Sequence, residues 1–113
     1  MSTDTDDAIF KALADARRRK MLDLLKEGPK TTGQICQQFK ELNRCTVMQH
    51  LGVLEAANLV IVRREGRCRW NYLNAMPIKD IHERWIGEYA VAAVGLLARL
   101  EESLRKPPKA WPE

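Results

Sequence analysis

The sequence predicts an α+β fold that is mainly helical, carries one β-hairpin and ends in a long helix. Between residues 43 and 73, a helix with apolar Val47, Leu51 and Leu54 on one face runs directly into two β-branched and aromatic segments around a glycine. From Pro77 to about Arg105, apolar residues recur at steps of three and four. Together these two patterns set the fold class.

Two helices are predicted in the N-terminal third of the chain. Residues 1–7 are polar and acidic and should fray, whereas residues 8–14 form a short amphipathic helix. Asp15 is placed to cap the second helix, which ends at Gly28-Pro29 because proline cannot continue a helix. The basic run 17–20 opens this helix, where positive charge opposes the helix macrodipole. We therefore expect that run either to meet phosphates or acidic residues such as Asp6 and Asp7, or to be a solvated charge run.

The third and fourth helices form a helix-turn-helix. Thr31 or Thr32 caps the first of the pair, and Asn43 caps the second after a turn at residues 40–43. The outer face of the second helix carries side chains suited to base edges and phosphates, with a cysteine among them: Arg44, Cys45, Thr46, Gln49 and His50. This pattern predicts a recognition helix.

The hairpin that follows is basic. Its strands are expected at residues 59–62 and 67–73, with the turn at Glu65-Gly66. Four arginines crowd the turn: Arg63, Arg64, Arg67 and Arg69. A polar helix beside a basic hairpin is typical of a winged helix-turn-helix, so the expected partner is double-stranded DNA.

The last helix, predicted over residues 77–105, has an apolar stripe wider than one small domain needs. We expect it to form a homodimer interface, joined by the first helix, with these residues: Ile9, Ile81, Trp85, Tyr89, Ala92, Ala93, Leu96, Leu97 and Leu100. A two-fold dimer would place two recognition helices about one DNA turn apart and predicts a pseudo-palindromic operator. The alternative is a long helix that only completes the monomer core. One winged helix-turn-helix domain would then span residues 1–106, and the proline-broken residues 107–113 are expected to be disordered.

Composition narrows the class of protein. The 113 residues include 19 Lys+Arg against 15 Asp+Glu, a net charge of +4 that suits a polyanionic partner. No stretch resembles a signal peptide or approaches the roughly 18 apolar residues of a membrane span. Three cysteines without close pairing indicate a reducing cytoplasm. With two histidines, no glycine-rich phosphate loop and no paired nucleophile and base, we expect no enzyme activity.

Two segments carry a family resemblance: AIFKALADARRRKMLDLLKEGP and TVMQHLGVLEAANLVIVRREGR. Over roughly residues 6–74 the chain resembles the bacterial ArsR/SmtB-type winged-helix regulators. The following LNAMPIKDIHERWIGEYA is similar to one branch of that family whose members often lack metal sites. The resemblance implies a homodimer that represses transcription by occupying an operator. It also implies that Thr46, Gln49 and His50 lie in the major groove, with the wing arginines near the minor groove or backbone. Two positions depart from the family pattern: Ala16 replaces the usual Pro, and Cys45 replaces Ser or Thr.

The metal sites of that family are not matched. The Cys-x-Cys of arsenic-type sites has no counterpart at residues 31–36, where Cys36 alone follows the apolar Ile35. Two of the three ligands of the zinc pattern Asp-x-His-x-x-His are present, Asp80 and His82, but Trp85 replaces the second histidine. One carboxylate and one imidazole do not complete a tetrahedral site. We therefore expect neither a metal nor another cofactor.

Three alternatives stay open at this point. Cys45 and Cys68 lie beside a helix N-terminus or arginines, which favour thiolates, so a thiol-based redox-sensing regulator is one. For Cys45 we favour the simpler interpretation that it replaces a serine-like residue and has no signalling role, because no resolving thiol is evident. An unidentified small-molecule effector, held by Trp70, Trp85 and Tyr89, is the second. The third is a winged-helix module that docks a protein, although such a wing has no need of four arginines.

Overall fold

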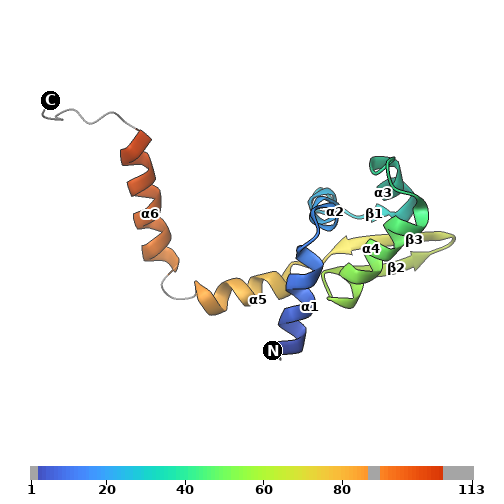
Figure 1. Cartoon of the computed structure of the whole chain (residues 1–113), viewed down its shortest axis with the longest axis horizontal. Helices are drawn as coiled ribbons and strands as arrows, with labels where there is room; N and C mark the ends of the chain where they lie inside the picture. The colour runs from blue at the N-terminus through green and yellow to red at the C-terminus, as the bar shows by residue number, and fades with distance from the viewer. Residues whose placement is uncertain (1–2, 87–89, 106–113) are drawn as a thin grey trace, which may run out of the picture. The chain divides into compact units, whose positions relative to one another are not determined.

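The computed structural model describes residues 3–86 and 90–105. Figure 1 shows helices α1 (Thr3–Leu13), α2 (Ala16–Lys26), α3 (Thr32–Gln38), α4 (Arg44–Ala56), α5 (Met76–Trp85) and α6 (Ala90–Arg105), and strands β1 (Lys30–Thr31), β2 (Val60–Glu65) and β3 (Cys68–Leu73). The mainly helical fold with a β-hairpin is confirmed. The chain divides into two compact units, residues 1–79 and residues 80–113. None of the described helices has both the length and the apolarity needed to cross a bilayer.

The core of the first unit is built around α4. Val47, Leu51 and Leu54, the predicted inner face of that helix, are all fully buried. Helices α1, α2 and α3 and strand β2 all contact α4. Ile9 of α1, which was predicted in the dimer interface, is also fully buried in the single chain and is therefore a core residue.

Local side-chain chemistry sets the helix starts. Asp15 caps α2 by accepting hydrogen bonds from the backbone N–H groups of Arg17 and Arg18. Thr31 and Gln34 form a reciprocal capping box at α3, and Asn43 accepts from the Thr46 N–H at 2.8 Å to begin α4. These three predicted caps are confirmed. Helix α1 begins earlier than predicted because acidic side chains in its first turn, Asp4 and Asp6, complement the macrodipole.

The connection from α4 to the hairpin is tight. Asn58 adopts a left-handed conformation with φ of 63°, which asparagine tolerates better than most residues. The Leu59 N–H donates to the Leu54 carbonyl and the Asn58 N–H to the Glu55 carbonyl, each at 2.9 Å, which is the Schellman pattern. Leu54 and Leu59, both fully buried, pack the corner, so the wing starts at a fixed place relative to α4.

The sheet is antiparallel with strand order β1-β3-β2. Register in the hairpin runs from Val60 opposite Leu73 to Glu65 opposite Cys68. The two loop residues are therefore 66–67, one position later than predicted, and Gly66 takes the positive φ of 61° that such short loops require. Strand β1 was not predicted, because two residues are too few to show an alternating pattern.

The C-terminal region contains two helices where the sequence predicted one. Helix α5 ends at Trp85, Ile86 is in a turn, and α6 runs from Ala90 to Arg105. Residues 87–89, including Tyr89 of the predicted interface, and residues 107–113, the predicted disordered tail, lie outside the described residues. Of the other predicted interface residues, Ile81 is buried, whereas Trp85 is 68% exposed. The α6 residues are exposed: Ala92, Ala93, Leu96, Leu97 and Leu100.

Candidate nucleic-acid interface

The recognition helix presents a polar face opposite its buried face. Arg44, Cys45 and Gln49 are exposed, and Thr46 is half-buried. Nothing in the described parts of the chain hydrogen-bonds the Gln49 side chain, so its amide is free to bind an external donor and acceptor. An amide has both groups and matches the paired acceptor and donor of adenine in the major groove.

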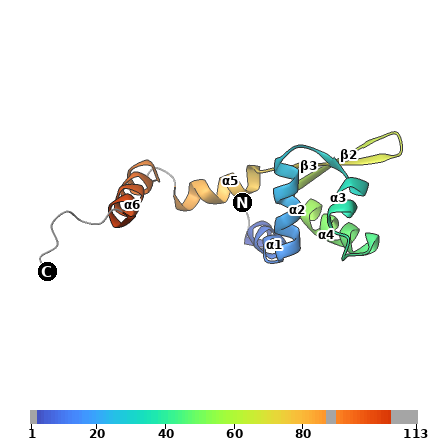
Figure 2. The same ribbon diagram turned by 90° about the horizontal axis from the view of Figure 1, so that it is seen from above.

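The hairpin extends the basic surface beyond the helices. Its tip projects past α3 and α4 in both Figure 1 and Figure 2. Arg63, Arg64 and Arg67 are exposed along it. Arg63 pairs with Glu65 at 3.3 Å, and across the described ranges no carboxylate lies within ion-pair distance of Arg64, Arg67 or Arg44. The guanidinium groups of Arg44, Arg64 and Arg67 are therefore available to bind an external anion.

A groove of about 400 Å³ lies between the wing, the start of α4 and the start of α3. It is lined mainly by basic and small polar residues, with Met48 as an apolar contact: Thr31, Thr32, Gly33, Arg44, Arg64, Arg67, Cys68 and Arg69. Guanidinium groups bind phosphate oxygens through charge-assisted hydrogen bonds. The groove is thus suited in charge to a phosphodiester backbone that passes between the recognition helix and the wing.

Arg69 has a different environment from the other wing arginines. Its guanidinium lies 3.2 Å from the Glu55 carboxylate on α4, and its side chain is only 22% exposed. Arg69 was predicted to contact DNA together with its neighbours. In the structure it ties β3 to the recognition helix through its salt bridge with Glu55.

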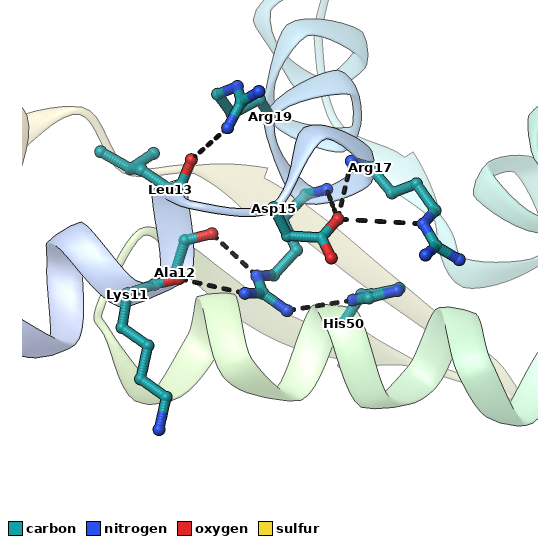
Figure 3. A network of polar contacts seen from close by, with 8 residues as sticks. Lys11, Ala12, Leu13, Asp15, Arg17, Arg19 and His50 are labelled. Carbon is teal, nitrogen blue, oxygen red and sulfur yellow. Dashed lines mark hydrogen bonds and ion pairs between the residues drawn. The ribbon is translucent and has the colours of Figure 1, made fainter.

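His50 was predicted on the outer face of α4 but lies against the start of α2 (Figure 3). Its Nδ1 is 3.2 Å from a terminal nitrogen of the Arg18 guanidinium. Burial lowers the pKa of His50 below its ordinary value of 6.5; Asp15 opposes this shift, and Arg18 and Arg17 add to it. His50 is therefore neutral near pH 7 and turned toward protein.

The basic run at the start of α2 also has internal partners. Arg18 donates to the carbonyls of Ala12 and Lys11 at 2.8 and 3.0 Å, and Arg19 donates to the Leu13 carbonyl at 2.7 Å (Figure 3). These carbonyls lie in the last turn of α1, where the ladder of helical hydrogen bonds ends, and the Lys11 carbonyl also accepts from the Ala14 N–H at 3.2 Å. The expected phosphate or acidic partners are therefore unnecessary for Arg18 and Arg19. The available sequence signal was an arginine run just past a helix end, where such side chains can bond the last carbonyls.

Asp15 stabilises the same corner from the other side. Hydrogen bonds from the backbone N–H of Arg17, and to a lesser extent of Arg18, hold the pKa of its carboxyl below the usual value of 3.8 despite opposing desolvation. The Arg17 side chain adds an ion pair at 3.9 Å. The corner between α1, α2 and α4 is thus a polar network that the sequence did not predict as a unit.

The described residues contain no cluster of metal ligands, and the cysteines differ in exposure. Within residues 3–86 and 90–105, no three His, Cys, Asp or Glu side chains are grouped so as to hold a metal ion. Cys45 and Cys68 are exposed, and Cys36 is half-buried.

Comparison with known proteins assigns the chain to a family. A family model described as "Bacterial regulatory protein, arsR family" matches residues 15–62, which include the whole helix-turn-helix. The transcriptional repressor SdpR of Bacillus subtilis is 36% identical over 72 residues, covering 64% of this chain and 79% of SdpR. The HTH-type transcriptional regulator YuzN of Bacillus subtilis is 38% identical over 86 residues, covering 71% of this chain and 94% of YuzN.

A solved structure gives the same answer for the fold. HlyU from Vibrio cholerae has a TM-score of 0.62 and 25% identity, covering 76% of this chain and 95% of HlyU. The winged helix of this chain therefore has the fold of known regulators. The chain belongs to the ArsR family of bacterial winged helix-turn-helix proteins; it is a DNA-binding transcriptional regulator and not an enzyme.

Proposed function

We propose that this chain acts in the cytoplasm as a homodimeric repressor that binds a pseudo-palindromic operator. Arg44, Arg64 and Arg67 carry the proposal, because they face one groove beside the recognition helix and no carboxylate of the described chain neutralises them. Gln49 would read a base edge, while Thr46, Cys45 and Arg63 border the contact. Repression itself is carried over from the similarity to the repressor SdpR.

The exposed apolar face of α6 supports the homodimer. Leu96, Leu97 and Leu100 are each more than half exposed, at 61%, 63% and 55%. A row of large apolar side chains in water is unfavourable and marks an interaction surface. In a symmetric dimer the same row of a second copy covers it, because a two-fold interface is self-complementary.

Selection of genomic fragments with purified, reduced protein at about 0.15 M salt tests whether the chain binds a specific DNA site. A salt titration of the affinity tests the phosphate contacts, because such contacts make affinity fall steeply as salt rises. We expect one palindromic site to be enriched. Arg67→Ala should make the slope of log affinity against log salt shallower by about 0.9 for each phosphate contact that is lost, and a homodimer loses one contact from each copy. Lys26→Ala removes one charge outside the groove and should leave the slope unchanged. A folded dimer that enriches no site would instead indicate a protein partner.

A further inference from the structure

His50 connects the recognition helix to the N-terminal helices through one hydrogen bond. A guanidinium can only donate, so the His50 Nδ1 that meets Arg18 at 3.2 Å must be unprotonated, and the ring proton is on Nε2. Nε2 is itself buried and has no hydrogen-bond partner within the described part of the chain. The ring of this α4 residue is therefore held against Arg18 at the start of α2, next in sequence to the exposed Gln49.

Arg18 also binds the end of α1. The same guanidinium that meets His50 also bonds the carbonyls of Ala12 and Lys11 at the end of α1. The Arg18 side chain of α2 thus joins the end of α1 to the middle of α4. A small shift of α4 at this joint moves Gln49, and base readout depends on the positions of such side chains to a fraction of an ångström.

Protonation of His50 would oppose this arrangement. A proton on Nδ1 removes the acceptor and sets an N–H against the N–H of Arg18, cation beside cation. The charged groups that face the ring are Arg18 and Arg17 from the first turn of α2 and Asp15 from its cap. Asp15 favours the protonated ring, whereas both arginines disfavour it. Protonation therefore favours an arrangement in which α4 has moved away from Arg18.

We propose that neutral His50 is a positioning residue, which fixes the recognition helix against Arg18 in its DNA-binding orientation and releases it when protonated. The proposal rests on the proposed binding of operator DNA. Operator binding should then weaken on acidification, because the bound state requires the unprotonated ring. A direct contact from His50 to phosphate gives the opposite sign, since added positive charge strengthens binding to DNA. The direction of the pH dependence separates the two roles.

Operator affinity measured between about pH 5.5 and pH 8 tests the proposal, because histidine titrates in this range. Wild type should bind more weakly at the acid end, by up to about tenfold for the one hydrogen bond that each copy of the dimer loses. His50→Asn keeps an acceptor on the same side-chain carbon that bears Nδ1, but does not titrate. It should bind as wild type does at pH 8 and stay flat on acidification. His82→Asn, at the second histidine, should keep the wild-type profile.

Circular dichroism at each pH checks that every variant remains folded. A flat or rising wild-type profile would overturn the proposal, as would an equal acid loss in His50→Asn. His50→Ala should bind about tenfold more weakly at pH 8, because it lacks any acceptor for Arg18. Absence of operator binding by wild type at every pH would refute the proposed function instead, so the two failures are distinguishable.

Discussion

At the scale of single residues, the partner of each arginine decides its role. Arg18 and Arg19 complete the end of α1, Arg69 braces the wing through Glu55, and Arg64 and Arg67 remain available to an anion. The charge pattern alone predicted a basic hairpin, and that prediction is confirmed. It could not separate these roles, because residues far apart in sequence supply the partners.

Gln49→Ala should relax sequence preference at one base pair of the operator. If the amide forms a bidentate contact to a base, its loss costs roughly 1–3 kcal/mol on the preferred sequence and little on the others. Affinities for the operator and for all single-base variants of it measure this. Equal weakening on every sequence would show that Gln49 contacts only the backbone.

The folded state should lose stability on acidification through His50. Its pKa is lowered in the folded protein, so the unfolded chain takes up the proton first, as pH falls through 6.5. Stability is complete above that pH, declines by at most about 1.4 kcal/mol per pH unit below it, and levels off beneath the folded pKa. Denaturant titrations of wild type and His50→Asn across this window test the prediction. The two curves should separate only below pH 6.5, and parallel curves would contradict the assignment.

At the scale of elements, the helix starts and the helix-to-wing corner follow from local chemistry. Asp15, Thr31 and Asn43 have side-chain oxygens that bond the first free N–H groups, so the sequence marks those starts directly. Strand β1 and the division between α5 and α6 were missed. β1 exists because β3 offers it hydrogen bonds, and the buried Asn71 holds it by donating to the Lys30 carbonyl at 3.2 Å. The apolar repeat of residues 77–105 continues across the division and does not reveal it.

Asn43→Ala should destabilise the fold by about 1 kcal/mol, because the Thr46 N–H loses its acceptor at the start of α4. Operator affinity should fall as well, since Arg44 and Cys45 stand in that first turn. Asn43→Ser, which restores a capping oxygen, is the matched control and should recover most of the loss. Equal stability of the alanine and serine variants in denaturant melts would show that the cap contributes nothing.

Arg69→Ala and Arg67→Ala should have opposite signatures. Removing Arg69 breaks the link between β3 and α4 and should cost up to about 1 kcal/mol of stability, with the salt dependence of DNA binding unchanged. Removing Arg67 should leave the thermal midpoint unchanged but reduce the salt slope. Thermal melts and salt titrations on both variants check this. A reduced salt slope in Arg69→Ala would place Arg69 on DNA after all.

At the scale of the whole molecule, the two compact units differ in how far their apolar residues are buried. The first unit has a buried apolar core around α4, whereas α6 in the second unit has exposed leucines along one side. The wide stripe predicted from the sequence is present there, and the homodimer remains a prediction. Ile9 is fully buried in the core of the first unit and is therefore not an exposed residue of the predicted interface.

Leu96→Asp should give a monomer and abolish operator binding, because a charge in an apolar interface is not solvated. Ala98→Asp adds the same charge about 200° further around α6 and should leave the dimer intact. Sedimentation of both variants and of wild type decides the point. An unchanged mass for Leu96→Asp, or a monomeric wild type, would remove α6 from the interface.

The sequence by itself determined the fold class, the buried face of the recognition helix, three helix caps and the basic wing. Each depends on the helical or strand period or on neighbours within four residues, which the order of residues specifies directly. Tertiary structure alone decided that His50 turns to Arg18, that Arg69 pairs with Glu55 and that Ile9 is core. Those outcomes depend on which elements surround a side chain, because a helical period fixes its direction around one axis but not what lies in that direction.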